Sequence, residues 1–325
     1  MPGMPEWQNK NFRGKNLIMT LSCHKLYLPT AIMLVVTLLA CAGCKENNTS
    51  SDKLGVCVSI LPQAEWVKAI GGDKVDVTVM IPPGASPHVY EPTASQMKAM
   101  TNSEIYAAVG SGIEFELNFL GKLLEINPGI LLVDCSQGVQ LIEVEEHQHG
   151  EEHPDEHNNS YDPHIWLSLT NTGIMATNIC NGIVATDPDN EEYYKQNLNQ
   201  YLNELDEMHQ TFKQGFSNLV NRVFIIQHPS MGYFARDYGL IQIAAEEGGS
   251  DATIQSMVNV IEQAKQNQVK IIFVSPQFPP NVADAVAREI EGTVEPLDTL
   301  AENYCENMQN IFDLMHGAMA ANQKT

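Results

Sequence analysis

The chain has 325 residues, of which 43% are hydrophobic and 18% are charged, and its formal net charge is −22 at pH 7. This length is sufficient for two domains that each bury a core, so the composition excludes a chain that is disordered throughout. The acidic balance also argues against nucleic acids and anionic membrane surfaces as partners and favours cations as ligands.

The N-terminal region predicts export. The apolar run Leu26–Ala40 is shorter than the ~20 residues that a membrane-spanning helix requires, so residues 1–40 are interpreted as a signal peptide, with Met19 as a possible true start. The sequence Leu-Leu-Ala-Cys that ends at Cys41 is typical of a lipobox, which makes Cys41 the predicted lipidation site. Cys44 is the alternative, and an uncleaved anchor helix is the alternative interpretation of the apolar run. Either way, the folded part is expected outside the cytoplasm.

Short β-rich runs alternate with amphipathic runs after the polar segment 41–54, whose composition is typical of a flexible tether. Strands are expected over residues 56–61, 75–81, 105–109 and 129–134, and helices over 63–70 and 93–101. Helical crossovers between strands favour parallel pairing. We therefore expect an N-terminal α/β lobe over residues 55–186.

Helical spacing dominates the middle of the chain. Apolar residues favour a helix over residues 170–185 and a longer one over 190–219. A helix of that length would extend ~45 Å, which is enough to join two lobes, so the linking helix is assigned to residues 187–220.

The α/β alternation resumes in the C-terminal lobe, residues 221–325. Strands are expected over residues 223–227 and 270–274, and helices over 231–238, 254–267, 282–290 and 303–320. The predicted fold class is α/β, with two lobes that each contain a mainly parallel sheet flanked by helices and are joined by one long rigid backbone helix.

Four potential metal ligands lie in turn-forming segments at the ends of predicted strands or before helices: His88, His164, His228 and Asp298. In an open α/β sheet, ligands bind beyond the carboxyl ends of the strands. A single histidine in such a position is more often a surface residue or a satisfied buried residue. The shared context of all four favours one site that the fold assembles, with two residues from each half.

Five segments carry a family resemblance: PPGASPHVYEPTASQ, DPHIWLS, HPSMGYFARDYGL, SPQFPPNVADAVAREI and PLDTLAENY. In order and approximate spacing they resemble signature segments of the zinc and manganese solute-binding proteins of ABC importers, the ZnuA/TroA-like family. The resemblance covers about residues 55–320. It implies a metal-binding cleft between two lobes, high-affinity capture of a divalent transition metal outside the cytoplasm, and delivery to an ABC permease subunit.

The resemblance also implies the ligand set. Position by position, His88 and His164 would be the ligands from the first lobe, and His228 and Asp298 those from the second. Three neutral imidazoles and one carboxylate suit a tetrahedral Zn²⁺ ion, whereas Mn²⁺ prefers more oxygen ligands. Manganese-binding relatives tend to have a carboxylate where His228 stands, so Zn²⁺ is favoured and Mn²⁺ is the alternative. A water could take the place of Asp298.

Two departures from the family pattern concern carboxylates. Many relatives have an acid at the position of Ser275, and some zinc-specific relatives have one just before the first histidine, where this chain has Pro87. Asp298 therefore remains the leading carboxylate. Acceptors that orient the imidazoles are also expected, with Glu91 and Asp162 as candidates.

An acidic, histidine-rich loop at residues 145–160 interrupts the first lobe. Its histidines are His147, His149, His153 and His157. A run of this composition cannot bury a core. It is either a solvated insertion without function or an auxiliary metal loop that raises the local zinc concentration; zinc-type relatives often carry a histidine-rich insertion here.

The chain is not expected to be an enzyme. A zinc hydrolase keeps an open metal position with a bound water, and the sequence contains neither an HExxH nor a GxSxG motif. A metal-dependent adhesin of similar fold is the other alternative. The expected protein is thus a monomeric, membrane-anchored lipoprotein that faces the periplasm or the cell exterior.

Overall fold

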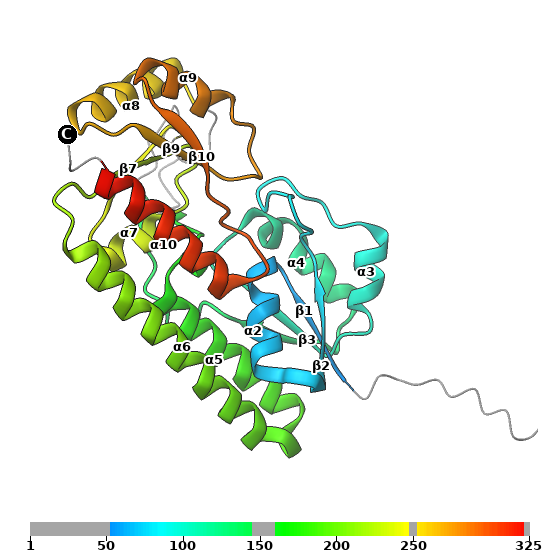
Figure 1. Cartoon of the computed structure of the whole chain (residues 1–325). Helices are drawn as coiled ribbons and strands as arrows, with labels where there is room; N and C mark the ends of the chain where they lie inside the picture. Colours follow the sequence, from blue (N-terminus) through cyan, green and yellow to red (C-terminus); the bar gives the residue numbers. More distant parts are fainter. Residues whose placement is uncertain (1–52, 145–159, 247–251, 322–325) are drawn as a thin grey trace, which may run out of the picture. The chain divides into compact units, whose positions relative to one another are not determined.

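Two four-stranded sheets form the framework of the structure (Figure 1). The computed structural model describes residues 53–144, 160–246 and 252–321, which all lie within one unit, residues 51–325. The predicted signal peptide, Cys41 and most of the tether lie outside the described residues, as do the four histidines of the acidic loop, His147, His149, His153 and His157.

The first sheet has the strand order β2-β1-β3-β4, and every neighbouring pair is parallel. Its strands are β1 (Leu54–Val58), β2 (Val75–Val79), β3 (Ile105–Ala108) and β4 (Leu131–Asp134). Its crossover helices are α2 (Leu61–Gly71), α3 (Ala94–Met100) and α4 (Glu114–Ile126). The predicted parallel pairing through helical crossovers is confirmed, and α4 is an element that the sequence analysis did not predict.

The second sheet, of order β10-β9-β7-β8, is also parallel throughout. Its strands are β7 (Val223–Ile226), β8 (Ile241–Ala244), β9 (Ile271–Val274) and β10 (Thr293–Pro296). Its helices are α7 (Gly232–Tyr238), α8 (Ile254–Gln266) and α9 (Asn281–Glu289). Counted in chain order, both sheets run second, first, third, fourth, so the two halves share one topology.

Long helices join the two halves (Figure 1). They are α5 (Leu169–Thr186), α6 (Glu191–Ser217) and α10 (Tyr304–Ala321). The 27 residues of α6 extend about 40 Å, and this helix packs against α2 and α5 as well as α7 and α10. The predicted linking helix is thereby confirmed. Within the described part of the chain, no helix combines the length and apolar character needed to cross a membrane.

A small antiparallel hairpin precedes α5. It pairs β5 (Glu143–Val144) with β6 (Ser160–Tyr161), so it flanks the histidine-rich segment on both sides. The chain then passes through a short 3-10 helix, η2 (Ile165–Leu167), into α5.

One apolar core reaches both sheets. The strand β7 shows how this core is built, because Phe224 and Ile226 belong to the larger cluster, which also contains residues of the first sheet. Val223 and Ile225 alternate with them and belong to a smaller cluster with residues of α8 and α9. Since successive side chains of a strand point to opposite faces, the second sheet packs α8 and α9 on one face and the shared core on the other.

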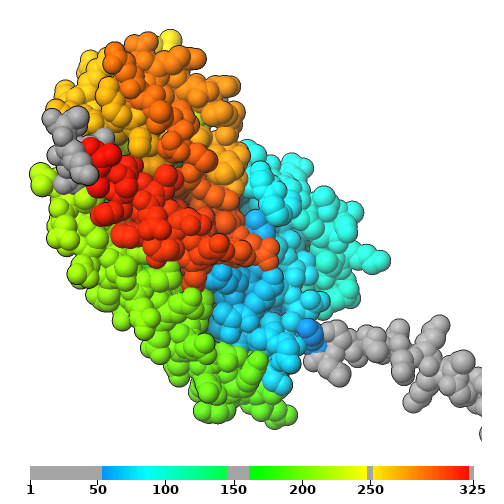
Figure 2. Space-filling model, in the orientation of Figure 1, coloured from blue at the N-terminus to red at the C-terminus, as the bar shows by residue number. Residues whose placement is uncertain are grey.

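The segment after β10, together with the first residues of α10, ties the second sheet to the first half. The Lys68 ammonium pairs with Glu302 at 2.6 Å, and Glu65 accepts a 3.1 Å hydrogen bond from the backbone N–H of Cys305. The Tyr304 hydroxyl donates to the carbonyl oxygen of Trp166 at 2.8 Å. In Figure 2 the red and orange C-terminal segment accordingly lies against the blue surface of α2.

Candidate metal centre

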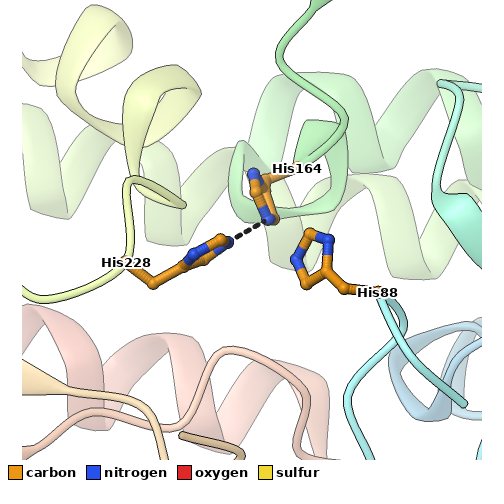
Figure 3. A group of neighbouring side chains, drawn as sticks. All are labelled: His88, His164 and His228. Carbon is orange, nitrogen blue, oxygen red and sulfur yellow. Dashed lines mark hydrogen bonds between the residues drawn. The ribbon is translucent and has the colours of Figure 1, made fainter. Parts of the chain in front are cut away.

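Three histidines from distant parts of the sequence meet between the halves (Figure 3). One ring nitrogen each from His88, His164 and His228 lie within 4.8 Å of one another. The side chains of His164 and His228 are 8% and 7% exposed, whereas that of His88 is 20% exposed. The structure thus brings together three of the four residues that the sequence analysis selected.

Local backbone contacts fix each of the three loops. The N–H of Phe115 at the start of α4 donates to the carbonyl of Pro87 at 3.1 Å, which anchors the loop of His88. His164 is the residue that precedes η2, and its own N–H donates to Asp162 at 2.9 Å. His228 follows β7 by two residues, and its carbonyl accepts the N–H of Ser230 at 2.8 Å.

The separation of the ring nitrogens suits a tetrahedral ion. The Nε2 atoms of His164 and His228 are 3.3 Å apart. Two Zn–N bonds of ~2.0–2.1 Å at a tetrahedral angle would place their nitrogens ~3.3–3.4 Å apart. The contact between these atoms in Figure 3 is a hydrogen bond only when one Nε2 carries a proton. A metal ion would take the place of that proton.

A carboxylate stands behind every ring. In each pair, the Nδ1 atom of the imidazole lies within hydrogen-bond distance of a carboxylate oxygen. The pairs are His88–Glu114 at 2.8 Å, His164–Asp162 at 2.8 Å and His228–Glu246 at 2.9 Å. A neutral imidazole that donates its Nδ1 proton to a carboxylate directs the lone pair of Nε2 away from it. The three pairs therefore leave three Nε2 acceptors for one central cation.

Burial and these pairings set the charges of the site. Burial lowers the pKa of His228, and the hydrogen bond to Glu246 opposes that effect without cancelling it. Burial raises the pKa of Glu114, but the hydrogen bond to His88, the charges of His88 and His164 and a backbone hydrogen bond together outweigh burial, so the pKa is lowered. His228 therefore favours its neutral, metal-binding form, and Glu114 favours its anionic form.

Aromatic rings line the site. Phe278 stacks on His228 with ring centroids 4.5 Å apart and an interplanar angle of 22°. Trp166 meets His164 edge to face at 5.3 Å. These rings restrict the orientations that the two buried imidazoles can adopt.

Asp298 does not belong to the group of converging ligand atoms. Its Oδ1 accepts the N–H of Leu300 at 2.9 Å and the side-chain amide of Gln277 at 3.2 Å. Gln277 directly precedes Phe278, so Asp298 lies beside the loop that stacks on His228. Its role as a fourth ligand stays a prediction.

Ser275 stands where the family resemblance led us to look for an acid. Its hydroxyl donates to the carbonyl of Leu297 at 3.0 Å and lies 2.9 Å from the hydroxyl of Thr299. The side chain therefore braces the segment around Asp298 and offers no carboxylate.

Two of the three orienting acids were missed in the sequence analysis. Asp162 orients His164 as predicted, but Glu91 is exposed and His88 is instead paired with Glu114. Glu246 follows β8 by two residues, as His228 follows β7, and the last paired residues of these strands are in register. Register between parallel strands is thus the signal that could have identified Glu246.

Comparisons with known proteins identify the relatives of this chain. The family model described as "ZnuA: Zinc-uptake complex component A periplasmic" matches residues 56–318. The chain is 31% identical over 280 residues to the high-affinity zinc uptake system protein ZnuA of Bacillus subtilis (strain 168), a match that covers 85% of this chain and 88% of that protein. It is 32% identical over 252 residues to the manganese ABC transporter substrate-binding lipoprotein PsaA of Streptococcus anginosus, which covers 74% and 78% of the two chains.

Solved structures of ZnuA are also similar to this chain. A crystal structure of ZnuA matches with a TM-score of 0.76 at 37% identity and covers 82% of this chain and 100% of that one. A zinc-bound deletion mutant of ZnuA matches with a TM-score of 0.75 at 36% identity, over 82% and 98% of the two chains.

Proposed function

Since the chain belongs to the ZnuA family of zinc and manganese solute-binding proteins of ABC uptake systems, we propose that it captures Zn²⁺ at His88, His164 and His228 and delivers it to an ABC permease. One observation carries this proposal. Each of the three rings is paired with a carboxylate through Nδ1, and their ring nitrogens converge. Such carboxylate–histidine pairs fix the tautomer and raise the basicity of the ligating nitrogen.

The donor set favours Zn²⁺ over Mn²⁺. Imidazole nitrogen suits Zn²⁺, whereas Mn²⁺ is better served by carboxylate, carbonyl and water oxygens. The three converging groups are all imidazoles. Mn²⁺ remains the alternative cargo, because a manganese-binding lipoprotein is among the relatives.

Asp298 completes the proposed coordination shell. Its carboxylate is half-buried and lies beside Gln277, next to the ring that stacks on His228. A small movement of the Asp298 segment toward the three imidazoles would give the four-coordinate shell that structural zinc sites prefer. A water in the fourth position is the alternative.

Membrane attachment and the acidic loop extend the proposal. Lipidation at Cys41 would hold the protein at the membrane beside its permease, and the lipobox supports this assignment. The loop histidines His147, His149, His153 and His157 would collect metal near the centre. This role is supported by the hairpin of β5 and β6, which brackets the loop and ends three residues before His164.

Metal analysis and calorimetry test the proposal. Protein purified without chelator should carry Zn²⁺, and metal-free protein should bind one equivalent of Zn²⁺ more tightly than Mn²⁺. His88→Ala and His228→Ala should abolish high-affinity binding. His209→Ala is the control, because the ring of His209 pairs with Tyr238 and does not belong to the converging group. Unchanged affinity in both site variants would refute the proposal, and tighter binding of Mn²⁺ would reverse the metal assignment.

A further inference from the structure

The hydroxyl of Tyr233 lies between two backbone groups at the base of the β5–β6 hairpin. It accepts a 3.1 Å hydrogen bond from the N–H of Ile142 and donates a 2.8 Å hydrogen bond to the carbonyl oxygen of Asp162. The N–H of Asp162 in turn donates to the carbonyl of Ile142 at 2.9 Å. Three hydrogen bonds thus close a ring around this point, and Tyr233 is fully buried.

Asp162 is the residue through which these bonds reach the candidate metal centre. Its Oδ1 accepts hydrogen bonds from Nδ1 of His164 at 2.8 Å and from the backbone N–H of His164 at 2.9 Å. A displacement of the Asp162 backbone would therefore displace or rotate the imidazole of His164. Among the described residues, Tyr233 is the only one whose side chain donates a hydrogen bond to the carbonyl of Asp162.

Gly232, the neighbour of Tyr233, accommodates the same carboxylate. A Cβ atom at this position would lie 2.3 Å from Oδ2 of Asp162, closer than real contacts allow. The absence of a side chain at Gly232 therefore leaves the space that the carboxylate occupies. Gly232 and Tyr233 together define both the backbone and the side-chain position of Asp162.

The two residues belong to the segment that also supplies a ligand from the other half of the chain. Gly232 is the first residue of α7, and His228 lies four residues before it. The loop of His228 and the support of His164 are therefore parts of one short segment. A displacement of α7 would therefore act on the support of His164 and on the loop of His228 together.

We propose that Tyr233 is a positioning residue of the metal site, whose hydroxyl fixes Asp162 and thereby aims Nε2 of His164 at the centre shared with His228. The inference rests on the proposed function, since an effect on affinity requires that His164 binds the metal. A purely structural hydroxyl would stabilise the fold and leave the imidazole of His164 where it is.

The variants Tyr233→Phe and Tyr238→Phe distinguish these roles. Both tyrosines are buried on α7, but the hydroxyl of Tyr238 pairs with His209 on α6 at 3.2 Å. Zinc affinity is measured by calorimetry, and the imidazole nitrogens of His164 are observed by NMR in the metal-free protein. The loss of one hydrogen-bonding group in Tyr233→Phe should weaken zinc binding by roughly three- to tenfold and shift the His164 signals. Tyr238→Phe should do neither.

Gly232→Ala gives a second, independent route to the same readout. The added methyl group must displace the Asp162 carboxylate, so the His164 signals should shift although the Tyr233 hydroxyl is retained. If Tyr233→Phe matches Tyr238→Phe in both affinity and His164 signals, the inference is wrong. If the wild-type protein binds neither metal at the histidines, the proposed function fails, whereas the metal-free NMR spectra still decide whether Tyr233 positions His164.

Discussion

The indole N–H of Trp166 donates a 2.8 Å hydrogen bond to the carbonyl oxygen of Thr299. Trp166 follows His164 by two residues, and Thr299 is the residue after Asp298. The bond therefore joins the segments that carry one proposed ligand from each half of the chain. Separation of the two halves would have to break this bond or keep the Asp298 segment together with the His164 segment.

Trp166→Phe removes this bond and keeps an aromatic ring beside His164. The buried Thr299 carbonyl loses its indole donor, which should lower the free energy of unfolding by about 1–3 kcal/mol. Zinc affinity should also fall, because the Asp298 segment loses its tie to the site. A double-mutant cycle with Asp298→Asn measures the connection: the effects on affinity should be non-additive. Strict additivity would contradict a shared action of the two residues.

Asp298→Asn tests the fourth ligand. The amide keeps an oxygen acceptor for the N–H of Leu300, so the local backbone should persist. Loss of the charge should weaken zinc binding by at least ~tenfold if the carboxylate coordinates the ion. Calorimetry checks this result. An affinity within about twofold of wild type would assign the fourth position to water.

Glu246→Gln tests the carboxylate behind His228. An amide in that position cannot hold the Nδ1 proton of His228 as strongly as the carboxylate does. Zinc affinity should fall by about 10–100-fold, as for other residues that orient metal-binding histidines. Glu262→Gln is a matched control, because Glu262 is an exposed glutamate on α8. Equal affinities of the two variants would show that Glu246 does not orient the ligand.

Zinc affinity should decrease as the pH falls, because a protonated imidazole cannot bind metal. Burial lowers the pKa of His228 from the ordinary 6.5. A proton should therefore compete with zinc at this ring only at a lower pH than at an ordinary histidine. Glu246 acts in the opposite direction, so Glu246→Gln should lower this pKa further. Zinc titrations down to about pH 5 test the competition, and undiminished affinity there would contradict the proposed shell.

The lowered pKa of His228 also affects the stability of the metal-free protein. Because the pKa of His228 is lower in the folded state, the unfolded state binds more protons at this residue below pH 6.5. The contribution of His228 to stability is therefore lost as the pH falls from 6.5 through its folded-state pKa. Thermal unfolding of wild type and His228→Gln across this range isolates that contribution.

The predicted fold class is confirmed, and the missed strands and the missed helix have different physical causes. The second-sheet strands β8 and β10 lie at its edges, and their residues are less buried than those of β7. An edge strand needs no continuous apolar run, so β-rich composition does not reveal it. The helix α4 buries Glu116 and exposes Leu117, which disrupts the apolar spacing expected of an amphipathic helix.

The acids behind the three histidines could be predicted only where they lie close to the histidine in the sequence. Asp162 lies two residues from His164, and the sequence analysis selected it. Glu114 and Glu246 are 26 and 18 residues from their histidines; Glu114 lies in α4, and Glu246 follows β8 by two residues. Because neither element was predicted, neither acid could be placed beside its ring.

The alternation of β7 side chains between two apolar clusters also determines how the protein unfolds. Phe224 and Ile226 belong to an apolar cluster that α10, which contacts β7, shares with α5, α6 and the first sheet, so a division of the chain after α6 would cut through this core. Neither half is therefore an independent folding unit, and heating should give a single cooperative melting transition in place of two. Because both sheets draw on this shared cluster, the described part of the chain is in this sense one thermodynamic body.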